Sequence, residues 1–443
     1  MIFEKIGLQV PKILLPEKGT DMHKWATIAC DQYTSDPGYW QRLEQQTTGA
    51  ISTLNLVFPE VYLDDADTEQ RISTINQAME TYLADGSLEE QPPGFILVDR
   101  KTAAVDSRKG LIVALDLEQY DYTKGAKSLI RSTEGTILDR LPPRIKVRQN
   151  APIELPHIMV LIDDPQQTVI EPLFDENLET VYNFDLLENG GQLKGYRVDQ
   201  PELIDQVVVA LEKLADPVAY HKKYQVDGEV MLYAMGDGNH SFATAKAIWT
   251  KLKEEADDPA DVMNSPARYA LVELVNVHDP GLEFEAIHRV LFNVNCVHLR
   301  QQMEDFFAAR NTPLTFTICA DLAEAKSVAD GRERAHSFPM ILGGKFAACV
   351  VENPECTLTV ATLQTFLDQY LEENSTVRID YIHGEKAVTK LGSEIGSVGF
   401  YLPAISKHDL FKTIVLDGAL PRKTFSLGEA DEKRFYLECR KIC

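Results

Sequence analysis

The feature that most constrains this chain is an apolar run that passes directly into a loop with two glycines and then into a helical pattern. Val230–Met235 reads VMLYAM, a run typical of a strand buried on both faces. Gly236–Ser241 reads GDGNHS and is called the Gly loop below. The next apolar residues recur at helical spacing: Phe242, Ala245, Trp249 and Leu252. The chain must therefore hold a strand, a tight loop and a helix in direct succession.

Helix and strand patterns alternate along the rest of the chain and predict an α/β (mixed α+β) fold. Predicted helices cover 68–84, 199–215, 298–309 and a stretch from 360, with two more after 382. Predicted strands are 94–100, 111–117, 157–165, 267–279, 314–318, 377–382 and 396–403, with a hairpin over 340–352 turning at Gly343–Gly344. Asp199 and Glu202 are expected to cap the second helix. Residues 1–60 are expected to be irregular, and the acidic stretch 253–261 a solvated loop.

Composition limits the class of protein. The 443 residues carry 44 Lys and Arg against 68 Asp and Glu, so the net charge is −24 and the surface repels polyanions. Nucleic acid and anionic membrane are therefore not expected as partners, and a small molecule is. The seven cysteines are scattered without a metal-binding or disulfide pattern, which favours a cytoplasmic setting. We expect three segments, 1–190, 191–295 and 296–443, with no linker between them.

The Gly loop has the residues of an anion site. The first N–H groups of a helix lack intrahelical partners, and the helix dipole adds partial positive charge there. Gly236 and Gly238 would permit positive φ and close approach of a phosphate, which Asn239, His240 and Ser241 would contact. Asp237 would act as a general base or hold Mg²⁺. The alternative is a βα turn in which Asp and Asn merely cap the helix.

Other motifs are less specific. A Walker A loop and a dinucleotide fingerprint are absent from the sequence. Asp21–His23 has the Asp-x-His spacing of a metallophosphoesterase ligand pair, and the Gly loop contains both a Gly-Asp and a Gly-Asn-His element of that class. We disfavour this class, because these two elements must come from separate loops to surround two metal ions, and here they overlap within five residues. We interpret Cys30 and Asp31 as buried packing residues rather than as residues of a substrate pocket. A run of cations could steer an anionic substrate or form a solvated face: Lys124, Lys127, Arg131, Arg140, Arg144, Lys146 and Arg148.

The sequence resembles a known family. YAMGDGNHSFATA is similar to the signature iADGHHRYeTA of the prokaryotic family called domain of unknown function 1015. Further matches are HIMVLIDDP, GLEFEAIHRVLFN and LPRKTFSLGE, so the resemblance spans nearly the whole chain. The Gly loop is in turn similar to that of the ParB/sulfiredoxin-like superfamily, which includes free serine kinases.

This resemblance implies a ParB/sulfiredoxin-like nucleotide-binding module at 191–295, embedded in a larger mixed-sheet protein. It implies ATP or ADP with Mg²⁺ as cofactors, and carries over Asp237 and His240 as catalytic residues. The phosphate contacts that we expect are Gly236, Gly238, Asn239, Ser241, His288, Arg289 and Lys423. Thr424 beside Lys423 would add a hydroxyl. No metal ligand set is assigned.

The loop departs from the family pattern at two positions. Asn239 stands where the family has its first His, and Ser241 where it has Arg, so the cation that would grip phosphate must come from Arg289, Lys246 or the cationic run at 124–148. The expected activity is phosphotransfer to a small hydroxyl compound, that of a small-molecule kinase. The alternatives are a non-catalytic nucleotide sensor and a purely structural loop.

Overall fold

The computed structural model describes residues 1–123, 125–329 and 334–443, and Lys124 of the cationic run lies outside them. The chain divides into two compact units. The first unit combines Met1–Glu283 with Leu427–Cys443, which is called the C-terminal segment below, and the second unit is Phe284–Ser426. The second unit therefore interrupts the first in sequence.

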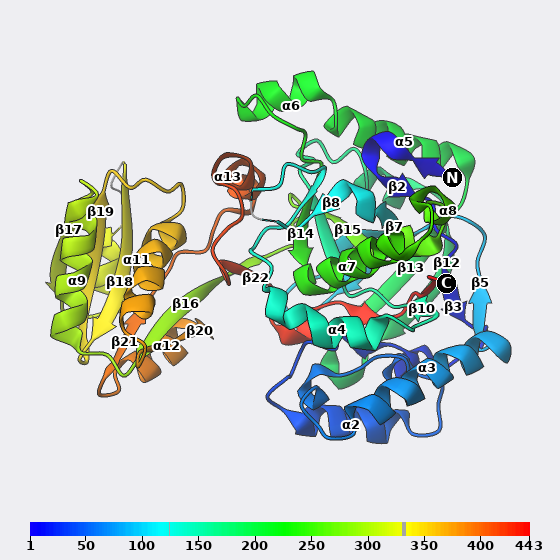
Figure 1. Ribbon diagram of the computed structural model, residues 1–443, viewed down its shortest axis with the longest axis horizontal. Helices are drawn as coiled ribbons and strands as arrows, with labels where there is room; N and C mark the ends of the chain where they lie inside the picture. The colour runs from blue at the N-terminus through cyan, green and yellow to red at the C-terminus, as the bar shows by residue number, and fades with distance from the viewer. Residues whose placement is uncertain (124, 330–333) are drawn as a thin grey trace. The chain divides into compact units, whose positions relative to one another are not determined.

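A large mixed sheet organises the first unit. In the described residues it has eleven strands, nine of them in the order β12-β13-β6-β7-β15-β11-β14-β9-β8 (Figure 1). The strands are β1 (Ile2–Phe3), β2 (Leu8–Gln9), β6 (Phe95–Lys101), β7 (Arg108–Asp116), β8 (Tyr120–Asp121), β9 (Ile130–Arg131), β11 (Met159–Ile162), β12 (Glu179–Asp185), β13 (Gln192–Val198), β14 (Tyr233–Asp237) and β15 (Tyr269–Asn276). β14 lies antiparallel to β11 and parallel to β9, so residues 191–283 share one sheet with the N-terminal segment.

Helices cover both faces of this sheet because alternate strand residues point to opposite sides. Leu97, Leu111 and Val113 pack with α5 (Pro201–Leu214) and α7 (Asn239–Glu255). Ile96 and Ile112 pack with α2 (Pro37–Thr47) and α3 (Thr68–Ala84). α4 (Leu141–Arg148) packs beside α7 (Figure 1). The shorter helices are α1 (Met22–Trp25), α6 (Pro217–Tyr224) and α8 (Pro259–Val262).

The C-terminal segment is held in the first unit by strand pairing and by buried ion pairs. β23 (Phe435–Tyr436) pairs with β4 (Thr27–Ile28), and β24 (Arg440–Lys441) with β10 (Ile153–Glu154). A third small sheet joins β3 (Leu14–Pro16) to β5 (Leu88–Glu90). Arg434 contacts Glu273 and Glu438 at 2.5 Å each, and Arg440 contacts Glu154 at 2.7 Å. These side chains are almost fully buried, so each charge depends on its partner.

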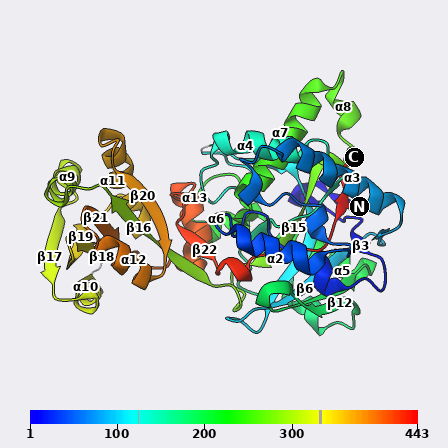
Figure 2. The same cartoon turned by 90° about the horizontal axis from the view of Figure 1, so that it is seen from below.

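The second unit has its own sheet between two helix layers. Seven strands are described there, six in the order β17-β19-β18-β21-β16-β20 with β22 beside β16 (Figure 2). They are β16 (Phe284–Phe292), β17 (Leu314–Cys319), β18 (Ala335–Leu342), β19 (Lys345–Glu352), β20 (Arg378–His383), β21 (Ser397–Phe400) and β22 (Phe425–Leu427). The helices are α9 (Cys296–Ala309), α10 (Leu322–Ala329), α11 (Thr359–Glu373), α12 (Glu385–Gly392) and α13 (Leu410–Asp417). α9 and α11 share one core, and α12 packs into another.

Most predicted elements are confirmed, including the helix at 68–84 and the hairpin turn at Gly343–Gly344. Three local predictions are wrong. Residues 1–60 are not irregular throughout, because α2 occupies Pro37–Thr47. Gln200 rather than Asp199 caps α5, and it makes no side-chain capping bond. Residues 253–261 are not one loop, because α7 runs to Glu255 and α8 follows after an Asp258 cap. Among the described residues, no helix is both long and apolar enough to cross a membrane.

Candidate functional site

The two glycines of the Gly loop serve different needs. Gly238 has φ of 78°, in the left-handed region, and a Cβ there would lie 3.0 Å from Cα of Ile158. Gly238 therefore turns the chain sharply between β14 and α7 against the neighbouring strand. The prediction of positive φ is wrong for Gly236, which is instead packed against Leu161 and Leu427, each 3.0 Å from the position of a Cβ.

The polar side chains of the Gly loop do not cap the helix. The N-cap residue is Gly238, and within the described chain α7 has no side-chain capping bond. Asn239 Oδ1 accepts a hydrogen bond from the Ser132 hydroxyl at 2.9 Å, and His240 Nε2 accepts one from the Ile137 N–H at 3.4 Å. The interpretation of GDGNHS as an Asp- or Asn-capped turn is therefore wrong, and the side chains of Asn239 and His240 face residues 132–137 instead.

Asp237 is paired with a cation from the C-terminal segment. Its Oδ2 lies 3.3 Å from Lys433 Nζ, and its Oδ1 accepts the Gly238 N–H at 2.8 Å. Burial disfavours the charged carboxylate, but the ammonium group of Lys433 and other neighbours, including the Gly238 N–H, outweigh it, so the pKa of Asp237 lies below its usual value. The site thus holds one carboxylate and one ammonium group at the end of β14.

His157 connects the Gly loop to a second polar chain. Its Nε2 lies 3.0 Å from Ser241 Oγ, and its Nδ1 lies 2.8 Å from the Tyr436 hydroxyl. Tyr436 donates to Cys30 Sγ at 3.0 Å and accepts the Cys30 N–H at 3.3 Å. Because the single phenolic proton goes to sulfur, we assign the Nδ1–H of His157 as the donor to Tyr436. The lone pair of Nε2 then faces the Ser241 hydroxyl.

The surroundings of His157 include carboxylates, cations and two neutral acids. Asp31 Oδ2 lies 3.9 Å from Nε2, and the charges of His157 and Asp237 interact. Burial raises the pKa of the Cys30 thiol and of the Tyr436 phenol well above their usual values, so both stay protonated near neutral pH.

A cavity of about 140 Å³ opens beside this cluster. Its polar lining includes Cys30, Glu60, Arg144, His157, Ser241 and Tyr436. Apolar side chains form most of the remaining wall, including Leu56, Phe58, Ile75, Met79, Val147 and Ile153. Convergent polar groups at one side of a mainly apolar cavity are typical of small-molecule sites.

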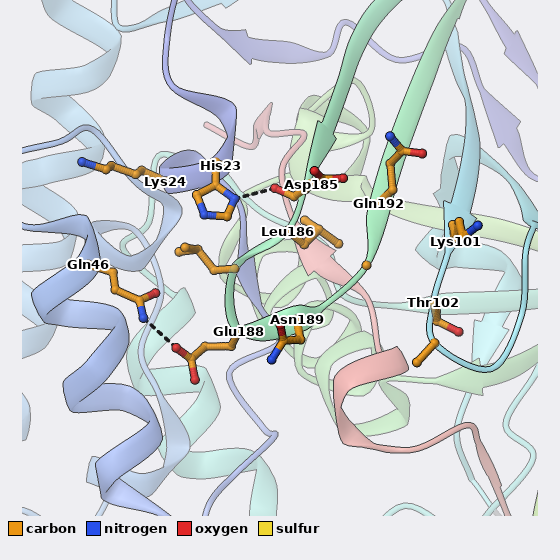
Figure 3. Close-up of a pocket in the computed structure, with 13 residues that line it drawn as sticks. His23, Lys24, Gln46, Lys101, Thr102, Asp185, Leu186, Glu188, Asn189 and Gln192 are labelled. Atoms are coloured by element: carbon orange, nitrogen blue, oxygen red, sulfur yellow. Dashed lines mark hydrogen bonds between the residues drawn. The ribbon is translucent and has the colours of Figure 1, made fainter.

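A larger groove of about 970 Å³ lies elsewhere in the first unit (Figure 3). In it His23 Nδ1 contacts the Asp185 carbonyl at 2.6 Å, and Gln46 donates to Glu188 at 2.7 Å. The lining residues that the structure describes include none from the Gly loop. We place the candidate site at the smaller cavity, because the titratable groups converge there.

His288, Arg289 and Lys423 belong to the second unit. His288 is buried on β16, where its Nδ1 accepts the Leu402 N–H at 3.0 Å. Burial lowers the pKa of His288 to about 4. Arg289 is fully buried and donates to Gln364 and to the carbonyls of Ile287 and Arg422.

Lys423 is exposed, with φ of 57°, and Thr424 donates to the Pro421 carbonyl at 2.6 Å. The hydrogen bonds recorded for these two residues and for the pair on β16 all lie within the second unit. Their role in phosphate binding stays a prediction.

The other cations proposed from the sequence also have local partners. Arg144 pairs with Glu60 at 2.5 Å, Arg148 with Glu154 at 2.5 Å and Lys146 with Glu69 at 2.6 Å. Arg131 donates to the carbonyls of Ser128 and Glu229, and Lys246 to that of Leu117. Lys127 and Arg140 are exposed. Of this set, Arg144 and Arg148 are among the described residues that line the cavity with Ser241.

Three residues of the site carry little signal in the sequence. Lys433 and Tyr436 lie far along the chain from the Gly loop and follow no motif. His157 stands at the start of the predicted strand 157–165, and we assigned it no functional role from the sequence. Asp21 caps α1 by accepting the His23 N–H, so its spacing reflects a turn. No group of three or more potential metal ligands occurs among the described residues.

The fold and site define a mixed α/β protein with a polar cluster at a βα loop beside a small cavity. The chain belongs to the family described as protein of unknown function (DUF1015), whose model matches residues 14–370. The predicted membership is thereby confirmed. No curated protein matches the sequence.

Solved structures show distant similarity. Free serine kinase in complex with AMP has 10% identity and a TM-score of 0.38, covering 75% of this chain and 91% of the kinase. A mutant of that kinase in complex with ADP has 9% identity and a TM-score of 0.38, covering 75% of this chain and 91% of the mutant. SbnI with C-terminal truncation from Staphylococcus aureus has 10% identity and a TM-score of 0.34, covering 74% of this chain and 82% of SbnI. Because these TM-scores lie below 0.5, we draw no conclusion about activity from them.

Proposed function

We propose that this protein is a nucleotide-dependent phosphotransferase that binds phosphate at the Gly loop and transfers it to a small hydroxyl compound. The observation that supports it is the meeting of Asp237, Lys433, His157 and Ser241 where β14 turns into α7, beside the cavity. Phosphoryl transfer needs mainly positioning and charge stabilisation, which such a cluster of fixed charges can supply.

The start of α7 and Lys433 supply the positive potential that the loop sequence lacks. α7 has 17 residues, long enough for a dipole that attracts phosphate at its first turn. Lys433 takes the place of the missing loop Arg as the nearest ammonium group recorded for Asp237. A bound phosphate would compete with Asp237 for this ammonium group, which links ligand binding to the state of the carboxylate.

Mg²⁺ fits this site as part of the nucleotide. Both oxygens of Asp237 already have partners, Gly238 N–H and Lys433, so the carboxylate offers at most one ligand to a metal. Mg²⁺ commonly uses one or two carboxylates and the phosphates of its nucleotide. The metal would neutralise phosphate charge, while Asp237 orients Lys433 toward the Gly loop.

We assign the ParB/sulfiredoxin-like module to residues 191–295 on the resemblance of the Gly loop. Its β14 and α7 would carry the phosphate site, and residues 1–190 would complete the acceptor pocket through Cys30, Arg144 and His157. A cytoplasmic setting would supply ATP or ADP with Mg²⁺.

Thermal unfolding with and without millimolar ATP, ADP, CTP or pyrophosphate, each with Mg²⁺, tests this function. A ligand at about 100 times its dissociation constant stabilises the native state by about 2.7 kcal/mol. We expect a shift for a nucleotide in the wild type and its loss in Lys433→Met and His240→Ala. Lys246→Met is the matched control, because Lys246 lies on the same helix and bonds the Leu117 carbonyl.

Absence of any nucleotide shift in a folded wild type would contradict the proposal. Equal loss of the shift in the Lys246 and Lys433 variants would show that charge at α7 in general, rather than the Asp237–Lys433 pair, matters.

A nucleotide sensor is the second candidate. The side chains of Asn239 and His240 already have partners in residues 132–137, so ligand binding would rearrange this segment. Turnover distinguishes the two functions: a kinase consumes ATP when an acceptor is added, and a sensor binds it without net transfer.

A further inference from the structure

The hydroxyl of Ser241 has the surroundings of a nucleophile. Its Oγ lies 3.0 Å from Nε2 of His157, and both residues line the cavity. We propose that Ser241 itself accepts the phosphoryl group of a nucleoside triphosphate, with His157 as the general base, so that the Gly loop carries a phosphoserine. This inference rests on the proposed function and adds a covalent step to it.

The hydrogen-bond network sets His157 in the protonation state of a base. Tyr436 receives the Nδ1–H, and Nε2 therefore presents its lone pair to the hydroxyl of Ser241. A nucleophile, a base in hydrogen-bond contact and a third group that orients the base form the arrangement of activated serines. Since Tyr436 is buried and protonated, it orients the ring without removing the second proton.

Two carboxylates belong to the surroundings of His157. Asp31 Oδ2 lies 3.9 Å from Nε2, and Asp237 interacts with the same ring. Lys433, which pairs with Asp237, keeps that carboxylate ionised.

The position of Ser241 directs its side chain toward the proposed phosphate. Ser241 is the third residue of α7, and side chains of a helix lean toward its N-terminus. The cavity of about 140 Å³ gives room for a phosphoryl group, and Arg144 in its wall adds a cation. The resulting phosphoserine would lie at a helix N-terminus, where a doubly negative group is stabilised.

The chemical step is balanced. A bond forms between Ser241 Oγ and the γ-phosphorus, while the bond from this phosphorus to the bridging oxygen breaks. The proton of the hydroxyl moves to His157 Nε2. The nucleoside diphosphate leaves with the electron pair of the broken bond. Water or a small alcohol can later take the phosphoryl group from serine.

Ser132 is a matched control that contacts the Gly loop from the segment after β9. Its hydroxyl donates to Asn239 Oδ1 at 2.9 Å and to the Glu134 carbonyl at 2.6 Å. Both of these recorded partners accept hydrogen bonds, but neither is a base of the imidazole type. A phosphorylation that depends on His157 should therefore select Ser241 over Ser132.

The experiment incubates the full chain with ATP and Mg²⁺ and measures phosphoserine by intact mass and peptide mapping. We expect one phosphoryl group at Ser241, none in Ser241→Ala and wild-type labelling in Ser132→Ala. His157→Ala should slow labelling by about 10²–10⁴-fold, the usual contribution of a general base. Imidazole added to this variant should restore part of the rate, which a structural role of His157 would not produce.

Nucleotide binding, measured in parallel by thermal unfolding with ADP and Mg²⁺, separates the possible failures. Binding without phosphoserine at Ser241 would overturn this inference and leave the proposed function standing. Absence of binding would overturn both. Ser241→Thr keeps the hydroxyl and serves as a folded reference; labelling at another residue, or no response to imidazole, would refute the role of the pair.

Discussion

Asp237 ionises in surroundings made by residues from distant parts of the chain. Burial raises the free energy of its charged form, whereas Lys433 and other neighbours, including the Gly238 N–H, lower it by a larger amount. Because its folded pKa lies below the unfolded value, the carboxylate stabilises the fold above the unfolded pKa, and this stability is lost as pH falls through the folded pKa.

Lys433→Met should therefore destabilise the protein more at pH 7 than at pH 4. Removal of the ammonium group leaves a largely buried carboxylate without its nearest cation, at an expected cost of roughly 1–3 kcal/mol, below the range for fully buried pairs. At acid pH the carboxylate of the variant is protonated and the difference shrinks. Denaturant unfolding of both proteins at the two pH values measures this.

The control is Lys441→Met in the same C-terminal segment. Lys441 is half exposed and lies 3.6 Å from Glu90, and such a pair contributes at most about 1 kcal/mol. A pH-independent effect of Lys433→Met would contradict the assigned ion pair.

His288 predicts a second pH dependence. Its pKa is lowered from 6.5 to about 4, chiefly by burial, and the residue is only 4% exposed. The neutral ring is fully favoured above pH 6.5, and stability is lost as pH falls toward 4, by up to about 3 kcal/mol. Unfolding of His288→Asn, measured from pH 7.5 to 4, should lack this part of the slope.

His298→Asn is the comparison for this measurement, because His298 is exposed on α9 of the same unit. The free energy of unfolding of this variant should keep the wild-type dependence on pH. If both variants keep it, the titration of His288 does not limit stability.

At the scale of elements, the turn from β14 to α7 depends on one glycine. Gly238→Ala would place a Cβ 3.0 Å from Ile158 in a residue with φ of 78°, so we expect a loss of roughly 1–3 kcal/mol and weaker nucleotide binding. Gly228→Ala is the control, because open space surrounds that glycine. It should leave stability unchanged or raise it slightly. Chemical denaturation measures the free energy of unfolding of both variants.

The sequence predicted elements better than it predicted contacts. The stripe Phe242, Ala245 and Trp249 is buried as expected, because helical periodicity is a local property. The cap at Asp199 is wrong because Pro201 occupies the first helical position, which makes Gln200 the N-cap.

The candidate site shows the same limit. The Gly loop was visible as a motif, yet the partners of its side chains were not. Lys433 reaches Asp237, and Tyr436 orients His157, only through the strand pairing of the C-terminal segment. Pairing between segments so far apart leaves no periodic signal in a single sequence.

At the scale of the whole molecule, the C-terminal segment stabilises the first unit through buried arginines. The double variant Arg434→Met, Arg440→Met would leave Glu273 and Glu154 buried with fewer partners, at about 3–5 kcal/mol for each pair. This is a large part of the usual stability of a domain, about 5–15 kcal/mol. Hydrogen exchange should show loss of protection in β15 while β16, β18 and β21 stay protected.

Equal loss of protection in both sheets would show that the two units unfold together. The Lys441→Met protein provides the reference for a substitution in the same segment without a buried charge.

The interruption of the first unit by the second has a consequence for synthesis on the ribosome. Asp237 and Ser241 are translated before residues 284–426, and Lys433 and Tyr436 only after them. At about 5–20 residues per second, the intervening unit takes roughly 7–30 s to make. Throughout that interval the nascent chain holds an unfinished pocket, so an incomplete polypeptide released early would carry the Gly loop without the residues that charge and orient it.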